Sequence, residues 1–181
     1  QELQNNSLTY DIIFESNILA TDFSQYRLII VGNQNFANPS NIPVDKNRAI
    51  ILNSHNYYKS SSTDFQLGWA SGARSGTTNQ NVKVVSPSHP IASLIPIEFQ
   101  DYTFYSEAST YFLKGTKPTG MTTIVSLASL STDSVVAVVS PGARFLNGKT
   151  AEQRNVFFGI PEVNSWTPAT KQLFANSIEW V

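Results

Sequence analysis

The chain has 181 residues, of which 14% are charged, and its formal net charge is −1. That length is enough for one domain with a sizeable core and does not call for a second. The 12 Lys and Arg residues are scattered, which argues against a nucleic-acid-binding surface because such a surface needs a concentrated basic patch. The longest apolar runs, such as residues 135–139, fall far short of the roughly 20 residues that span a bilayer.

Short apolar runs bounded by turn-forming residues predict strands that are covered on both faces. In chain order they are residues 10–14, 26–31, 49–52, 82–85, 122–125, 135–139 and 155–158. Alternating apolar and polar residues at 102–106 and 110–113 predict edge strands with one wet face. Residues 59–81, rich in Ser, Gly and Thr, are expected to form a long loop that is functional or mobile.

Helices are scarce in this pattern. Short turns are expected at residues 22–25, 39–45 and 90–94. The one clear helix is 167–180, because Thr167 is suited to the N-cap and Pro168 to the first helical position. We therefore predict a single α/β domain over residues 1–181, with a mixed sheet that is parallel in the middle and antiparallel at one side.

The composition also suggests where the protein works. Ser, Thr and Asn supply 22, 15 and 16 positions, and the chain has no Cys and one Met. A neutral polar surface without oxidisable side chains favours an extracellular, cell-surface or virion-associated protein. The start at Gln1, without a basic and apolar leader, predicts a mature form or a segment of a longer polypeptide. Asn5, in an Asn-Asn-Ser sequon, matters only if the host glycosylates.

Five segments in a fixed order carry a family resemblance. They are residues 26–32, residues 42–52, a His-Pro-Ile segment at 88–94, a strand with a leading Arg at 154–159, and the terminal helix ending in Trp180. Together they resemble the class I glutamine amidotransferase-like superfamily, closest to its trehalose-utilisation-like and extracellular, non-catalytic branches, over residues 8–58 and 82–181. The resemblance implies a flavodoxin-like three-layer sandwich with a mostly parallel, partly mixed sheet.

One part of that family pattern is missing. A first strand and a first helix, which the resemblance implies, are not recognisable ahead of Tyr10. Either the chain was cut there or its sheet is completed differently.

Working amidotransferases of this superfamily place a cysteine on a sharp strand-to-helix turn, with a His and a Glu to activate it. The resemblance puts that turn at residues 52–55, so that Ser54 or Asn53 takes the nucleophile's place. Because the chain has no cysteine, thiolate chemistry on glutamine is excluded.

Ser54 is also a poor candidate for a hydrolase nucleophile. Adjacent residues on a strand point to opposite faces, so His55 projects away from Ser54, and His89 is the only other histidine. Leu52 and Asn56 stand where a nucleophile elbow has glycines. We therefore expect Ser54 to cap a turn, and His89, next to Pro90, to have a local structural role.

Four residues are candidates for holding a ligand: Asn53, His55, Tyr57 and Trp69. Amides and aromatic rings around His55 suit a sugar, whereas a solvated polar turn is the alternative. Trp69 lies in the Gly-rich segment 67–76, where it is either a lid or partner anchor, or a core residue.

No metal or cofactor is expected. Two distant histidines without cysteine cannot form a closed zinc site, and no calcium loop or nucleotide-binding glycine motif is present. The preferred function is a non-catalytic structural or binding module. Its partners would be other copies of itself, possible through edge pairing at 102–113, neighbouring domains of the same polypeptide, or glycans. The alternatives are a serine-type hydrolase acting on a glycan or ester, and a carbohydrate-binding module.

Overall fold

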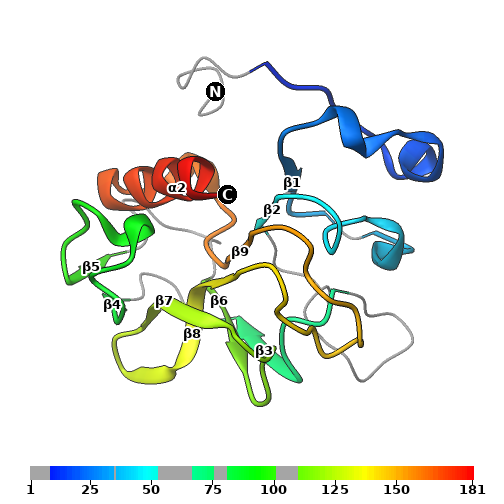
Figure 1. Ribbon diagram of the computed structural model, residues 1–181. Helices are drawn as coiled ribbons and strands as arrows, with labels where there is room; N and C mark the ends of the chain where they lie inside the picture. The colour runs from blue at the N-terminus through cyan, green and yellow to red at the C-terminus, as the bar shows by residue number, and fades with distance from the viewer. Residues whose placement is uncertain (1–8, 35, 53–66, 76–80, 101–109) are drawn as a thin grey trace.

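Residues 9–34, 36–52, 67–75, 81–100 and 110–181 are described in the computed structural model of the protein, with backbone alone at 73–75 (Figure 1). The strands are β1 (Ile29–Val31), β2 (Ala49–Leu52), β3 (Gly72–Ser75), β4 (Asn81–Val84), β5 (Glu98–Gln100), β6 (Tyr111–Lys114), β7 (Thr122–Leu127), β8 (Leu130–Val139) and β9 (Asn155–Phe158). The helices are η1 (Glu15–Ala20), η2 (Phe23–Gln25), η3 (Pro39–Asn41), η5 (Pro90–Ala92), η6 (Val163–Ser165) and α2 (Pro168–Trp180).

The strands form one mixed sheet. Its main path runs β1-β2-β9-β8-β7-β4-β5, and β6 joins β8 to β3. β2 pairs in parallel with β1 and with β9, whereas the other ladders are antiparallel. The predictions of a mixed sheet and few helices are confirmed, although antiparallel pairing takes a larger share than expected. The carboxyl ends of β1, β2 and β9 therefore meet at one edge of the sheet.

Both faces of the central strands β2 and β9 are buried, as the apolar runs predict. Along β2, Ile50 and Leu52 belong to one core cluster and Ala49 and Ile51 to the other, because successive strand residues point to opposite faces. Strands covered on both faces read as continuous apolar runs, which explains why β2 could be recognised in the sequence.

Helix α2 covers one face of the sheet (Figure 1). The Thr167 hydroxyl accepts a hydrogen bond from the Thr170 amide (3.1 Å). Pro168 lies in the first turn, where a backbone N–H would have no partner within the helix, so its missing N–H costs nothing. The predicted helix 167–180 is thus confirmed. Among the described residues, the other face is covered by 3-10 turns and coil rather than by α-helices, so a three-layer sandwich is not confirmed.

Several predicted elements differ from the structure. Residues 10–14, predicted as a strand covered on both faces, are not part of the sheet. β6 is paired on both sides, with β3 and β8, and is therefore not the expected edge strand. Residues 102–106 lie outside the described residues. β5 was not predicted, because its three residues are too short to form a pattern.

The Gly-rich segment is packed where the structure describes it, rather than a mobile loop. Residues 67–70 are buried, and residues 72–75 form β3. Gly68 has a φ of +73°, and a Cβ there would lie 2.8 Å from the Asn147 amide nitrogen, so only glycine fits. Trp69 is 0% exposed and packs against Phe145 and Phe157, with ring centroids 5.6 and 6.1 Å away. Of its two interpretations, the core position is the one observed.

Candidate functional site

At the amino ends of β2 and β9, a group of side chains holds the end of α2. The Arg154 guanidinium donates to the Trp180 carbonyl (2.7 Å) and lies 4.9 Å from the centroid of that indole ring. Arg48 donates to the Val181 carbonyl (3.1 Å). Cations are favourable at a helix C-terminus, where the carbonyls lack partners. We call Arg48, His89, Arg154 and Trp180 the C-terminal cluster.

His89 also belongs to this cluster. Its ring lies 5.2 Å from that of Trp180, and its Nδ1 accepts a hydrogen bond from the Ile91 amide (3.3 Å), which caps η5. Burial, reinforced by the nearby charge of Arg154, lowers the pKa of His89. The expected structural role is confirmed. The ring stands at the amino ends of β2 and β9, beside Arg154.

The carboxyl edge of the parallel strands is where ligands bind in open α/β sheets. The chain leaves β2 at Leu52, and the candidates Asn53, Ser54, His55 and Tyr57 lie outside the described residues.

Two polar side chains come from the strands on either side of β2. Asn33 follows β1 and Glu162 follows β9, both are exposed, and the Asn33 amide donates to Glu162 Oε1 at 3.3 Å. Because β1 and β9 are separated by β2, this hydrogen bond joins segments from both sides of the end of β2.

Close packing fixes the segment that carries Glu162. A Cβ on Gly159 would lie 2.0 Å from the Tyr111 carbonyl oxygen, so β6 can pass this close only over a glycine. The next turn is held by Trp166, whose indole donates to the Ile160 carbonyl (2.9 Å) and whose ring packs 4.9 Å from that of Phe174 on α2. Glu162 is therefore presented from a rigid base.

A groove of about 670 Å³ borders this edge. It runs between the N-terminal segment, β1 and the end of α2, and it reaches the carboxyl edge at Gly32 and Gln34. Aliphatic side chains such as Leu28, Ile30 and Ile178 line it together with polar and charged ones such as Arg27 and Glu179. The volume is within the usual range for ligand sites, about 300 to 1,000 Å³.

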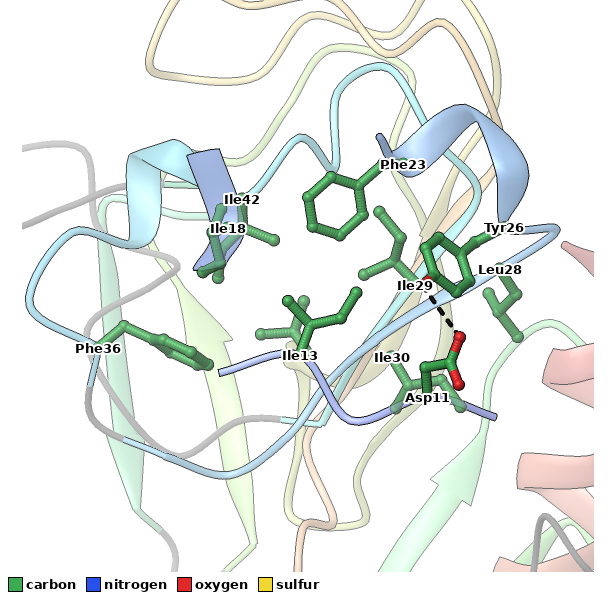
Figure 2. A pocket seen from close by; sticks show the side chains of 11 residues that line it. Asp11, Ile13, Ile18, Phe23, Tyr26, Leu28, Ile29, Ile30, Phe36 and Ile42 are labelled. Carbon is green, nitrogen blue, oxygen red and sulfur yellow. Dashed lines mark hydrogen bonds between the residues drawn. The ribbon is translucent and has the colours of Figure 1, made fainter. Parts of the chain in front are cut away.

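A smaller cavity of about 110 Å³ lies around β1, under the N-terminal segment. Figure 2 shows side chains such as Ile13, Phe23 and Phe36 pointing into it. Its polar side chains, Asp11 and Tyr26, are hydrogen-bonded to each other at 3.0 Å, and that bond raises the pKa of Tyr26. We therefore interpret this cavity as a gap in packing.

The chemistry available at the carboxyl edge is that of an amide beside a carboxylate. Such a pair can accept from and donate to neutral hydroxyl groups. No group of three or more His, Cys, Asp or Glu side chains suited to a metal ion occurs in the part of the chain that the structure describes. Among the same residues, no helix is long and apolar enough to cross a membrane.

Asn33 and Glu162 were missed in the sequence. The rule that places ligands at the carboxyl ends of parallel strands was applied to β2 alone. Applied equally to the runs that became β1 and β9, it would have found both residues. What the sequence could not show is that the two segments converge, since that depends on which strands flank β2.

Comparisons with known proteins match the fold. No family model matches the chain, and no curated protein matches it in sequence. Among solved structures, a cytoplasmic protein from Salmonella typhimurium is 10% identical, with a TM-score of 0.62, over 99% of this chain and 84% of its own. A ThuA-like protein from Bacteroides uniformis is 11% identical, with a TM-score of 0.61, over 98% of this chain and 78% of its own. Another, from Parabacteroides merdae, is 12% identical, with a TM-score of 0.61, over 99% of this chain and 81% of its own.

These matches support the resemblance at the level of the fold. ThuA-like (trehalose utilisation) proteins belong to the glutamine amidotransferase-like superfamily, and this chain is similar to them in fold.

The expected extracellular, cell-surface or virion-associated location is corrected by the comparison, because one matched protein is described as cytoplasmic and nothing in the described residues supports export. The physical reason is that a neutral polar surface without cysteine is compatible with a reducing compartment as well as an oxidising one.

Proposed function

We propose that this protein is a non-catalytic binding module that holds a neutral, hydroxyl-rich ligand, of the carbohydrate class, at the carboxyl edge of β1, β2 and β9. The observation that carries the proposal is the exposed Asn33–Glu162 pair at 3.3 Å, which joins segments from both sides of β2. A carboxylate next to an amide offers acceptors and donors in fixed positions, which is what sugar hydroxyls require.

The surroundings support binding without catalysis. The chain has no cysteine, and His89 is occupied at the opposite end of the strands by its cap and by Trp180. A serine hydrolase would therefore depend on His55, the residue directly after Ser54. The sequence leads us to expect that adjacent side chains there point to opposite faces, which is unfavourable for a nucleophile and its base.

A glycan array tests the proposal. We expect the wild-type protein to bind a subset of neutral glycans, and the Asn33→Ala/Glu162→Ala variant to lose that signal. Gly32→Ala is the matched control, because it alters the same segment where no atom lies within 4 Å of a new Cβ. An array without binding, or a double variant that binds like wild type, would refute the proposal.

A fluorophosphonate probe tests the absence of catalysis separately. We expect no covalent labelling of the folded protein, because activated serine hydroxyls react with such probes and unactivated ones do not. Labelling that a Ser54→Ala variant abolishes would show that the site is a hydrolase.

A further inference from the structure

The groove beside β1 changes in chemical character along its length. Gly32 and Gln34 line it at the carboxyl edge, where β1 has ended. Leu28 and Ile30 line it further back along the chain, and Arg27 precedes them. Because an extended chain rises about 3.3 Å per residue, Leu28 and Gly32 lie about 13 Å apart. The β1 side of the groove therefore has a neutral polar end, an apolar middle and a charged end, in that order.

Helix α2 supplies a second wall with the same polarity. Arg48, which precedes β2, donates to the Val181 carbonyl at 3.1 Å, so the end of α2 lies at the amino ends of the strands. Glu179 lines the groove near this end, as Arg27 does, and both side chains are exposed. Ile178 packs, with Leu28 and Ile30, against one core cluster. These three aliphatic side chains thus give the groove an apolar floor.

The N-terminal segment, residues 9–13, supplies the remaining wall. Tyr10 and Ile12 line the groove and are 49% and 73% exposed. Two polar side chains of the groove, Asp11 and Tyr26, are hydrogen-bonded to each other at 3.0 Å. Since that pair is already satisfied, the middle of the groove mainly offers a ligand apolar contacts.

We propose that the ligand at the carboxyl edge is a soluble glycoside whose sugar carries an apolar aglycone of the alkyl-chain type, and that the aglycone lies in this groove. The inference rests on the proposed carbohydrate site and specifies its ligand. Gly32 and Gln34 flank Asn33 in the chain, so the neutral end of the groove adjoins the Asn33–Glu162 pair. A substituent on a sugar bound there can enter the groove directly.

The lining favours an alkyl chain over further sugar units or a charged tail. Sugar hydroxyls placed against Leu28, Ile30 and Ile178 would lose water without gaining partners, which is unfavourable. A charged tail would gain little, because Arg27 and Glu179 have opposite charges and both are exposed to water. An alkyl chain is stabilised by each CH₂ group that it buries against the aliphatic side chains.

A series of alkyl glycosides tests the inference. Methyl, butyl and octyl glycosides of glucose, galactose and mannose are titrated below their micelle concentrations, and backbone amide shifts are followed by NMR. Full burial of one CH₂ group is worth about fourfold in affinity. Because the groove is open on one side, we expect the octyl glycoside of an active sugar to bind at least about tenfold tighter than the butyl one. It should also shift the amides of Leu28, Ile30 and Ile178, which the methyl glycoside leaves unchanged.

A substitution in the groove separates a specific site from general stickiness. Ile12→Asp places a carboxylate against the chain, and the native side chain is 73% exposed, so its loss should not unfold the protein. We expect this variant to lose the gain in affinity from butyl to octyl. Leu94→Asp is the control, because Leu94 is 88% exposed and does not line the groove. It should keep the whole gain.

The inference and the proposed function fail in different ways. Methyl glycosides that shift the Asn33 and Gln34 amides, with octyl glycosides binding no tighter, would overturn the aglycone site and leave the carbohydrate site standing. Octyl binding that persists in the Asn33→Ala/Glu162→Ala variant would also overturn the inference, because the chain would then bind without the sugar. Absence of binding by every member of the series, together with a glycan array without signal, would overturn both.

Discussion

The two ends of the parallel strands use their side chains differently. At the amino ends, Arg48, His89 and Arg154 are hydrogen-bonded or stacked within the C-terminal cluster that holds α2. At the carboxyl ends, Asn33 and Glu162 are exposed, and the Asn33 amide donates a hydrogen bond to Glu162. The most recognisable segments of the sequence, His-Pro-Ile, the leading Arg and the terminal Trp, therefore stabilise the fold. Ligand chemistry is to be sought at the other end.

The largest expected effect concerns the rigidity of the carboxyl end. Gly159→Ala would place a Cβ 2.0 Å from the Tyr111 carbonyl oxygen and 2.8 Å from that of Val135. Relief requires the backbone of β6 to move, so we expect a loss of about 3 kcal/mol in the free energy of unfolding. Urea denaturation measures it. The control Gly32→Ala should change it by less than about 0.5 kcal/mol, and equal effects of the two variants would contradict a rigid base for Glu162.

The next effect concerns the C-terminal cluster. Arg154→Ala removes a hydrogen bond to a helix-end carbonyl and a stacked cation, and we expect a loss of about 1 kcal/mol because the site is exposed. Arg154→Lys keeps the charge but not the planar stacking surface, and it should recover only part of the loss. Thermal unfolding followed by circular dichroism compares the three proteins. A lysine variant as stable as wild type would show that charge alone matters.

A smaller effect is the pH dependence due to His89. Burial lowers the pKa of His89 in the folded protein below its ordinary value of 6.5, so the unfolded chain binds the proton more readily and stability falls as the pH drops through that value. His89→Asn keeps a side-chain acceptor for the Ile91 amide and removes this titration. In urea unfolding at neutral and mildly acidic pH, we expect the variant to lose less stability on acidification than wild type. An identical loss would mean that His89 is not the titrating group.

The smallest effect on stability is expected at the proposed binding site itself. Glu162→Gln replaces an exposed carboxylate by an amide of the same shape and should change the free energy of unfolding by less than about 0.5 kcal/mol. Binding of a glycan ligand should nevertheless weaken, because the strongest acceptor is lost. Titration calorimetry with a glycan found on the array measures the change in binding affinity. A stability loss as large as that of Gly159→Ala would indicate a structural role instead.

The parts of the fold that could be predicted from the sequence are those in which one local signal dominates. β2 and β9 read as apolar runs because both of their faces are buried. Helix α2 begins where Thr167 and Pro168 predict. Residues 10–14 also read as a strand, but they pair with none of the strands that the structure describes, and pairing depends on the rest of the chain.

The candidate site could be predicted only in its location. The Ser, Gly and Thr content around Trp69 suggests a loop, yet Gly68 serves a close approach to Phe145 and Asn147, and Trp69 fills the core. Asn33 and Glu162 are 129 positions apart in the chain. Their proximity follows from strand order, which no local pattern in the sequence encodes.

The contrast between the two ends is tested most directly by following backbone amide chemical shifts by NMR while a panel of neutral disaccharides is added. Our account predicts that an active disaccharide shifts the amides of Asn33, Gln34 and Glu162 and leaves those of His89, Arg154 and Trp180 unchanged. Shifts confined to the C-terminal cluster, or no shift with any member of the panel up to solubility, would contradict it.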